Sequence, residues 1–308
     1  MKIAVIGAGA MGSIYGGHLS ENNEVLMIDT NPEVVKKINE NGIRLQENGT
    51  EKICHPRATQ DTTKETPADL VILFVKALYS KAALQSNRQL IGSDTYLLTL
   101  QNGAGHEELL GEFTDTAHII IGTTEDNGAV LEDGSIRHGG MGRTNIGMLQ
   151  PDENHILDRI AQTFDACGFQ TKIHENIQYL IWDKLFTNVS LSALTAVFQV
   201  PMGYIAGNEY AWKVARQLIR EAVRTAEALG LHFDEEEIAA RVKATSENNP
   251  QELTSICMDI KNHRKTEVET ISGAVVRAAA RAGVAVPAHE IVVNMIHALE
   301  SRQEEDHV

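Results

Sequence analysis

The stretch MKIAVIGAGAMG, residues 1–12, decides how this chain begins to fold. Apolar residues run from Ile3 to Ile6, and glycines follow at positions 7, 9 and 12 in the spacing G-x-G-x-x-G. Glycines occur in many turns, so this spacing alone is a weak signal. It indicates a dinucleotide site when a strand precedes it and a helix follows it.

That context is present here. We predict a strand at Lys2–Ile6, a helix at Gly9–Glu21 and a second strand at Glu24–Ile28. In such a unit the first glycine permits a tight turn, the second lets the backbone approach a pyrophosphate, and the third lets helix and strand pack closely. The amides at the helix N-terminus then hold the phosphates. The predicted cofactor loop consists of Gly7, Ala8, Gly9, Ala10, Met11 and Gly12.

Asp29 ends the second predicted strand, 17 residues after Gly12. A carboxylate at this place accepts hydrogen bonds from the adenosine ribose and would repel a 2′-phosphate. We therefore expect an NAD(P) cofactor, with Asp29 favouring NAD over NADP. The alternative is that Asp29 only caps the helix that follows it.

Composition limits the classes of partner. The 308 residues favour two domains, and a net charge of −15 argues against binding nucleic acid. No apolar run reaches the roughly 18 residues that a membrane span needs, and three scattered cysteines fit a reducing cytoplasm. No histidines stand in H-x-x-x-H or H-E-x-x-H order, so no metal site is expected. We expect a small-molecule substrate, no membrane partner and, from the long apolar helices, a homodimer.

The first half of the chain alternates strand and helix signals, which favours a Rossmann-type doubly wound parallel sheet. Pro32 suits the first turn of a helix at 31–41, and Gly42 suits its end. Glycine-rich residues 123–148 predict hairpin strands at the sheet edge. The remaining predicted elements are strands at 70–75, 96–100, 118–122 and 171–174 and a helix at 156–166.

From about residue 176 the apolar spacing is helical. We place the domain boundary near residue 172: a dinucleotide-binding Rossmann domain at 1–172, then an all-helical substrate and dimerisation domain at 173–308. A small ligand is expected between the two domains. The predicted helices of the second domain are 177–196, 210–229, 234–246, 255–282 and 289–301.

Two segments of the helical half carry polar residues among apolar ones. Lys184, Asn188 and Ser192 follow each other at intervals of four and form one stripe on a helix. Unpartnered polar groups on a buried helix cost about 1–3 kcal/mol each, so a stripe that faces a cleft would find partners in a ligand. We read Ser192 as a packed serine and leave it out of the predicted site. The second segment, 252–275, holds Ser255, Asp259 and Glu267.

With these motifs in order, the chain resembles the ketopantoate reductases, the 2-dehydropantoate 2-reductase family. The resemblance extends over nearly the whole length. Its motifs are G-A-G-A-M-G at 7–12, V-K at 75–76, Q-N-G at 101–103, W-x-K-L-x-x-N at 182–188 and D-I-x-x-x-R-x-T-E at 259–267.

The resemblance implies that a hydride passes from reduced nicotinamide to the ketone carbon of a 2-oxo acid and gives a D-2-hydroxy acid. For the family this is ketopantoate to pantoate, in pantothenate biosynthesis. Lys184 is then the general acid and stabilises the oxyanion, and Glu267 is its orienting partner. Asn188, Ser255 and Asn102 bind substrate, and Lys76 and Asn102 lie at the nicotinamide end of the cofactor.

Two departures from the family pattern keep an alternative open. Ser192 stands where many relatives carry a second asparagine, and Asp29 stands where relatives that use NADPH tend to have an arginine. Both fit an NAD-dependent D-2-hydroxyacid dehydrogenase that acts on branched or aromatic 2-oxo acids. A more remote alternative is a nucleotide-binding sensor without catalytic activity.

Overall fold

The computed structural model describes residues 1–140 and 142–305, and the chain divides into two compact units. The first unit contains residues 1–101 and 106–178. The second contains residues 102–105 and the chain from residue 179 onward. The boundary expected at residue 172 falls inside a strand at Gln170–Ile173, which belongs to the first unit.

The first unit is built on an eight-stranded sheet, as the prediction of a doubly wound sheet requires. All neighbouring strands are parallel except one antiparallel pair, β11 with β8. The spatial order of the strands is β12 (Gln170–Ile173), β11 (Arg143–Met148), β8 (Ile119–Thr124), β7 (Tyr96–Thr99), β6 (Leu70–Leu73), β1 (Lys2–Ile6), β2 (Glu24–Ile28) and β5 (Arg57–Thr59).

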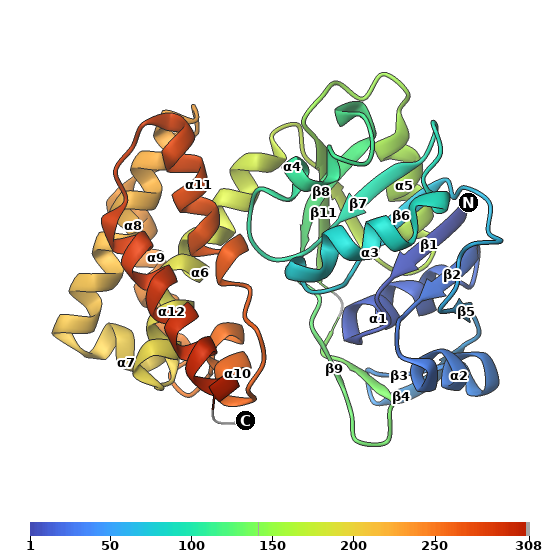
Figure 1. Ribbon diagram of the computed structural model, residues 1–308, viewed down its shortest axis with the longest axis horizontal. Coiled ribbons are helices and arrows are strands. Elements are labelled where there is room, and N and C mark those ends of the chain that lie inside the picture. Colours follow the sequence, from blue (N-terminus) through green and yellow to red (C-terminus); the bar gives the residue numbers. More distant parts are fainter. Residues whose placement is uncertain (141, 306–308) are drawn as a thin grey trace. The chain divides into compact units, whose positions relative to one another are not determined.

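Helices cover both faces of this sheet, with α3 (Ser80–Ser86) and α5 (Ile156–Asp165) on opposite sides (Figure 1). On one face the Tyr15 ring of α1 stacks on Phe169 at 4.4 Å and lies 6.0 Å from Phe164 of α5. This aromatic cluster anchors α1 in the core. The helices of the unit are α1 (Ala10–Leu19), α2 (Pro32–Asn41), α3 (Ser80–Ser86), α4 (His106–Leu110) and α5 (Ile156–Asp165), with 3-10 turns η1 (Ala77–Tyr79), η2 (Arg88–Leu90) and η3 (Thr116–His118).

A second sheet of four strands packs against the other side of α1. The prediction of hairpin strands at the sheet edge for 123–148 is partly right, because β11 joins the main sheet antiparallel to β8, next to the edge strand β12, whereas the hairpin before it does not join that sheet. Its strands β9 (Gly128–Val130) and β10 (Ile136–His138) instead pair with an unpredicted hairpin, because β10 runs beside β3. That hairpin consists of β3 (Ile43–Glu47) and β4 (Thr50–Cys54).

The second unit is helical. No helix in the described part of the chain combines the length and the apolar character that crossing a bilayer requires. The elements are α6 (Ile177–Phe198, which starts in the first unit), α7 (Met202–Gly207), α8 (Glu209–Ala228), α9 (Glu235–Asn248), α10 (Ser255–Lys261), η4 (Val268–Thr270), α11 (Ser272–Ala282) and α12 (Pro287–Glu305).

The single helix predicted at 255–282 is wrong, because the chain leaves helical geometry between α10 and α11. Asn262 ends α10, and His263 adopts a positive φ of 52°. The backbone N–H of Thr266 donates to the carboxylate of Glu300 on α12 at 2.7 Å, a bond that a continuous helix would not allow. The break places Glu267 at the start of the short turn η4.

The backbone of the glycine loop explains why glycine stands at two of its positions. Gly7 has φ of +102°, and a Cβ there would lie 2.9 Å from the carbonyl carbon of Phe74. A Cβ on Gly12 would lie 1.8 Å from the carbonyl oxygen of Gly7. A Cβ on Gly9 would meet nothing within 4 Å.

Gly12→Ala should therefore destabilise the protein, whereas Gly9→Ala, its matched control, should not. Forcing a methyl group into a packed region costs about 1–3 kcal/mol, and a domain of this size loses about 2–4 °C in Tm for each kcal/mol. Thermal unfolding followed by circular dichroism measures the difference. Equal melting temperatures for the two variants would contradict the close packing of loop and helix.

Candidate functional site

Asp29 is attached to the glycine loop by a direct hydrogen bond. Its Oδ2 accepts from the backbone N–H of Ala8 at 2.8 Å, and its Oδ1 accepts from the N–H of Asn31 at 2.9 Å. The N–H of Gly7 donates to the carbonyl of Ile28 at 2.7 Å, which fixes the same corner. A carboxylate can accept about four hydrogen bonds. Holding the loop therefore leaves Asp29 with acceptor capacity for a ligand.

A cavity of about 300 Å³ opens beside this corner. Asp29 and Gly7 line one part of it, and Val75, Tyr79 and Ala83 supply apolar surface. The strand order places the cavity at the switch point of the sheet, because β1 lies between β2 and β6. Ligands of doubly wound sheets bind at this place. An apolar wall with one carboxylate suits the base and ribose of an adenosine.

The N-terminus of α1 suits the phosphates. Gly9 is the N-cap residue, and no acidic side chain stands in the first turn. The first amides of a helix lack partners within the helix and favour an anion. Gly9 is exposed with open space where a Cβ would be. The predicted loop from Gly7 to Gly12 therefore fits a dinucleotide.

Lys76 follows β6 and is partly exposed at the start of η1. Its turn is held by Gln101, a residue that the predicted site did not include. The Gln101 side-chain amide donates to the carbonyl of Val75 at 2.5 Å and to the hydroxyl of Ser80 at 2.9 Å. The Q-N-G motif that follows β7 is the sequence signal that could have identified Gln101 as a site residue. Gln101 thus joins the ends of β6 and β7.

In the second unit, the loop 102–105 packs on the segment that contains Glu267. The N–H of Ala104 donates to the carbonyl of Thr270 at 2.9 Å, and the N–H of Thr270 donates to the carbonyl of Glu267 at 3.1 Å. Gly103 has φ of +101°, and a Cβ there would lie 2.0 Å from the Thr270 oxygen. Asn102 and Glu267 are therefore brought to one region, with Asn102 exposed and Glu267 partly buried.

The three polar residues predicted to form a stripe lie on α6, and each is less exposed than the one before it in the chain. Lys184 is exposed and Asn188 partly buried, whereas Ser192 is only 4% exposed. The hydroxyl of Thr254 donates to the carbonyl of Ser192 at 3.2 Å, which fixes the start of α10 against this helix. Ser255, the first residue of α10, is exposed. The predicted substrate residues Asn188 and Ser255 thus stand on two elements that contact each other.

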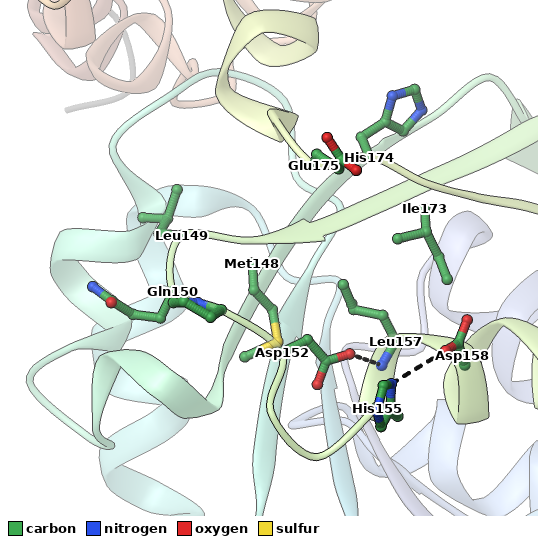
Figure 2. Close-up of a pocket in the computed structure, with 11 residues that line it drawn as sticks. Met148, Leu149, Gln150, Asp152, His155, Leu157, Asp158, Ile173, His174 and Glu175 are labelled. Carbon is green, nitrogen blue, oxygen red and sulfur yellow. Dashed lines mark hydrogen bonds and ion pairs between the residues drawn. The ribbon is translucent and has the colours of Figure 1, made fainter.

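A larger cavity, about 510 Å³, lies between the ends of β11 and β12 and the start of α5. Several of its polar side chains already have structural partners, and Figure 2 shows the contact of Asp152 with Leu157. Both carboxylate oxygens of Asp152 accept backbone N–H groups of α5 at 2.9 Å, and a ring nitrogen of His174 lies 2.8 Å from the Asn145 side-chain oxygen. Burial, together with Lys172 and Arg143, lowers the pKa of His174. None of the predicted site residues lines this cavity.

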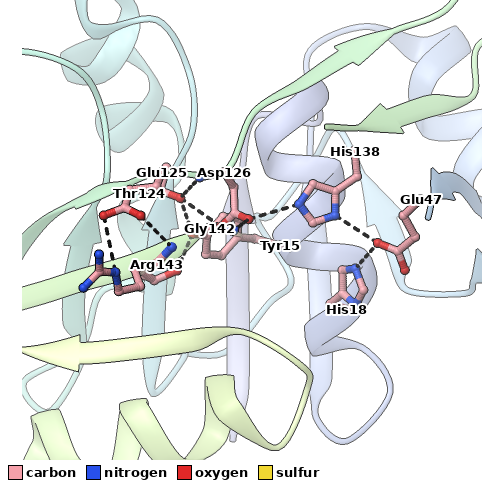
Figure 3. A network of polar contacts seen from close by, with 10 residues as sticks. Tyr15, His18, Glu47, Thr124, Glu125, Asp126, His138, Gly142 and Arg143 are labelled. Atoms are coloured by element: carbon pink, nitrogen blue, oxygen red, sulfur yellow. Dashed lines mark hydrogen bonds and ion pairs between the residues drawn. The ribbon is translucent and has the colours of Figure 1, made fainter. Parts of the chain in front are cut away.

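Another polar network lies around α1 and the four-stranded sheet and includes His18, Glu47, Asp126 and His138 (Figure 3). Burial raises the pKa of Glu47, but the two histidines beside it outweigh burial, so this pKa lies below its ordinary value. Burial also raises the pKa of Tyr15. No sequence pattern predicts this network, because its members are far apart in the chain.

Comparison with known proteins covers both units. The model of the family "Ketopantoate reductase PanE/ApbA" matches residues 3–151, and the model of its C-terminal region matches residues 176–300. A 2-dehydropantoate 2-reductase of Halobacterium salinarum is 30% identical over 96% of this chain and 98% of its own length. One of Pyrococcus horikoshii is 30% identical over 98% of both chains.

Solved structures agree with these matches. A D-mandelate dehydrogenase in a ternary structure with NADH and anilino(oxo)acetate superposes with a TM-score of 0.89, at 31% identity over 99% of both chains. A PanE/ApbA family ketopantoate reductase of Ralstonia eutropha gives a TM-score of 0.89, at 27% identity over 99% of this chain and 100% of that one. On these matches and this fold, the chain belongs to the ketopantoate reductase family, whose members are oxidoreductases that use a nicotinamide cofactor.

Proposed function

We propose that this protein reduces 2-dehydropantoate to a D-2-hydroxy acid with a reduced nicotinamide cofactor. The observation that carries the proposal is the match of one chain to both halves of the family model, over 3–151 and 176–300. The curated relatives that are 30% identical over nearly the full length carry the name 2-dehydropantoate 2-reductase.

A reduced nicotinamide held at the glycine loop would supply the hydride for the ketone carbon. The ketone oxygen then needs a proton and stabilisation of its negative charge. We assign both tasks to Lys184, because its ammonium group combines a proton donor with a positive charge. The residue is exposed on α6, next to the buried Leu185 and to Asp183, which binds Arg241 at 2.6 Å. The Asp183 carboxylate is thus paired with Arg241 of α9.

Glu267 is assigned as the orienting partner of Lys184. Its place at the start of η4, outside any α-helix, supports this role because the surrounding turn is held by Thr270 and Glu300. Asn188, Ser255 and Asn102 are assigned to substrate hydrogen bonds. Their exposed or partly exposed amide and hydroxyl groups suit the carboxylate and hydroxyl oxygens of a 2-oxo acid. Lys76 and Asn102 are assigned to the nicotinamide end.

We assign NAD rather than NADP as the preferred cofactor. Asp29 lines the cavity beside the glycine loop, where its negative charge disfavours a 2′-phosphate. The NADH-bound D-mandelate dehydrogenase, 31% identical, fits this preference.

A homodimer in the cytoplasm completes the proposal. Tyr210 and Val214 are exposed one turn apart on α8, and Ile291 and Met295 are exposed one turn apart on α12. Such apolar pairs suit a helix-to-helix interface. The three cysteines are free, buried thiols, which suits a reducing compartment.

Light scattering coupled to size exclusion tests the homodimer. It should give twice the mass of the chain, and a monomer mass would contradict the dimer.

A second candidate function has one specific observation in its favour. The D-mandelate dehydrogenase neighbour matches at a TM-score of 0.89, so an NAD-dependent dehydrogenase for branched or aromatic 2-oxo acids fits the same fold. The family name and the curated relatives favour 2-dehydropantoate.

Steady-state rates separate these functions. 2-Dehydropantoate, 2-oxoisovalerate and benzoylformate should each be assayed with NADH and with NADPH. We expect the highest kcat/KM for 2-dehydropantoate with NADH. A preference for benzoylformate would favour the second candidate. Binding of NADH without turnover of any 2-oxo acid would favour a nucleotide sensor and contradict both enzymes.

Lys184→Ala should lower kcat at least about 100-fold, the usual scale for removing a general acid or an oxyanion donor. Lys184→Arg retains the positive charge but holds its proton too tightly to donate it. It should therefore recover only part of the rate. Lys243→Ala is the matched control, because Lys243 is an exposed lysine on α9 that lies 3.8 Å from the Glu247 carboxylate. A near-normal kcat for Lys184→Ala would refute the assignment.

A further inference from the structure

Three residues that commonly bind metal ions converge in the first unit. His18 comes from α1, Glu47 from β3 and His138 from β10. One ligand atom from each lies within 4.8 Å of the other two. Figure 3 shows the two imidazole rings directed at the same carboxylate.

Two of the three spacings are close to those of a coordination sphere, and the third, between the two histidine nitrogens, lies within 4.8 Å. Oε2 of Glu47 lies 3.0 Å from Nε2 of His18 and 2.9 Å from Nδ1 of His138. Around a tetrahedral Zn²⁺ with bonds of about 2.0–2.1 Å, neighbouring ligand atoms lie about 3.3–3.4 Å apart. Each of these two contacts would have to lengthen by only a few tenths of an ångström.

One of the two remaining ring nitrogens has the surroundings of a metal-bound histidine. Nε2 of His138 lies 3.0 Å from Oδ1 of Asp126, which also accepts the N–H of Gly142 at 2.8 Å. A metal-bound histidine usually donates its other N–H to a carboxylate, and Asp126 stands where that acceptor belongs. Nδ1 of His18 is buried without a hydrogen-bond partner, because the Glu21 carboxylate 3.8 Å away pairs with Lys52.

The site gathers buried carboxylates. His138 lies between Glu47 and Asp126, with ring nitrogens 2.9 and 3.0 Å from their carboxylate oxygens. The side chains of His138 and Asp126 are fully buried, and a buried charge is costly unless it is paired. A divalent cation beside Nδ1 would offset the two carboxylates.

A cavity gives access to this place. It has a volume of about 420 Å³ and is lined by Glu47 and His138 together with Asn48, Glu51 and Arg137. A water molecule from this cavity can complete a three-residue ligand set. A dry, sealed core would offer neither an entry path nor a fourth ligand.

We propose that His18, Glu47 and His138 form a binding site for a divalent transition-metal ion of the zinc class. Two imidazoles and one carboxylate favour such ions over Mg²⁺ and Ca²⁺, which prefer oxygen ligands. The ion joins α1 to the four-stranded sheet. His18 lies eight residues beyond Ala10, about 12 Å along α1 from the glycine loop, so the role is structural. The site does not depend on the proposed reaction.

Metal titration of the full-length protein tests the site. After treatment with a chelator and its removal, Zn²⁺ is added in competition with a chromogenic chelator, and Tm is measured with and without Zn²⁺. We expect one equivalent bound per chain and a higher Tm. His18→Gln and His138→Gln should abolish this binding, and Asp126→Asn should weaken it about 10–100-fold.

His155→Gln is the matched control, because His155 is an exposed histidine with a carboxylate, that of Asp158, 3.7 Å away. It should bind as the unchanged protein does. Co²⁺ added to the unchanged protein gives a second readout that needs no variant, since tetrahedral Co²⁺ absorbs visible light far more strongly than hydrated Co²⁺. Failure to bind Zn²⁺, a Co²⁺ spectrum of the hydrated ion, or equal losses in His155→Gln and His138→Gln would overturn the site and leave a hydrogen-bonded network only.

Discussion

The hydrogen bond from the Ala8 amide to the Asp29 carboxylate is the interaction on which the proposed cofactor site depends. It ties the end of β2 to the loop after β1 over 2.8 Å, in the corner where the N-terminus of α1 begins. The packing of Gly12 against Gly7 and the turn at Gly7 require glycine at both positions of this loop. One carboxylate thus shapes the loop and lines the adjacent cavity, so the residue that caps the turn also faces the place proposed for the cofactor.

The second unit places its polar residues through a break in helical structure. The chain leaves the helix after Lys261 and resumes it at Ser272, and the N–H of Thr266 is held by Glu300. Burial raises the pKa of Glu300, but hydrogen bonds from Thr266 and His297 outweigh burial and keep this pKa below its ordinary value. A carboxylate that stays charged holds the break firmly. Glu267 consequently lies in a fixed turn beside the loop 102–105.

Local signals in the sequence predict β1 and β2 with their observed bounds, and Asn31 caps α2 as the Pro32–Gly42 pattern implies. The prediction omitted the hairpin of β3 and β4: β3 does alternate apolar and polar residues over 43–46, but the signal is short, and β4 lacks such an alternation. The break within 255–282 depends on Glu300, which is 34 residues away from Thr266. The cluster of His18, Glu47 and His138 likewise depends on tertiary structure. Candidate residues can therefore be named from motifs, whereas partners that come from distant elements cannot.

The cofactor preference tests the central claim most directly. Dissociation constants for NADH and NADPH are measured by fluorescence on the unchanged protein and on Asp29→Ala. If the Asp29 carboxylate reads the ribose, the unchanged protein binds NADH more tightly, and the variant loses most of this preference because the repulsion of a 2′-phosphate is gone. Tighter binding of NADPH by the unchanged protein, or a ratio of the two constants that Asp29→Ala leaves unchanged, would contradict the account.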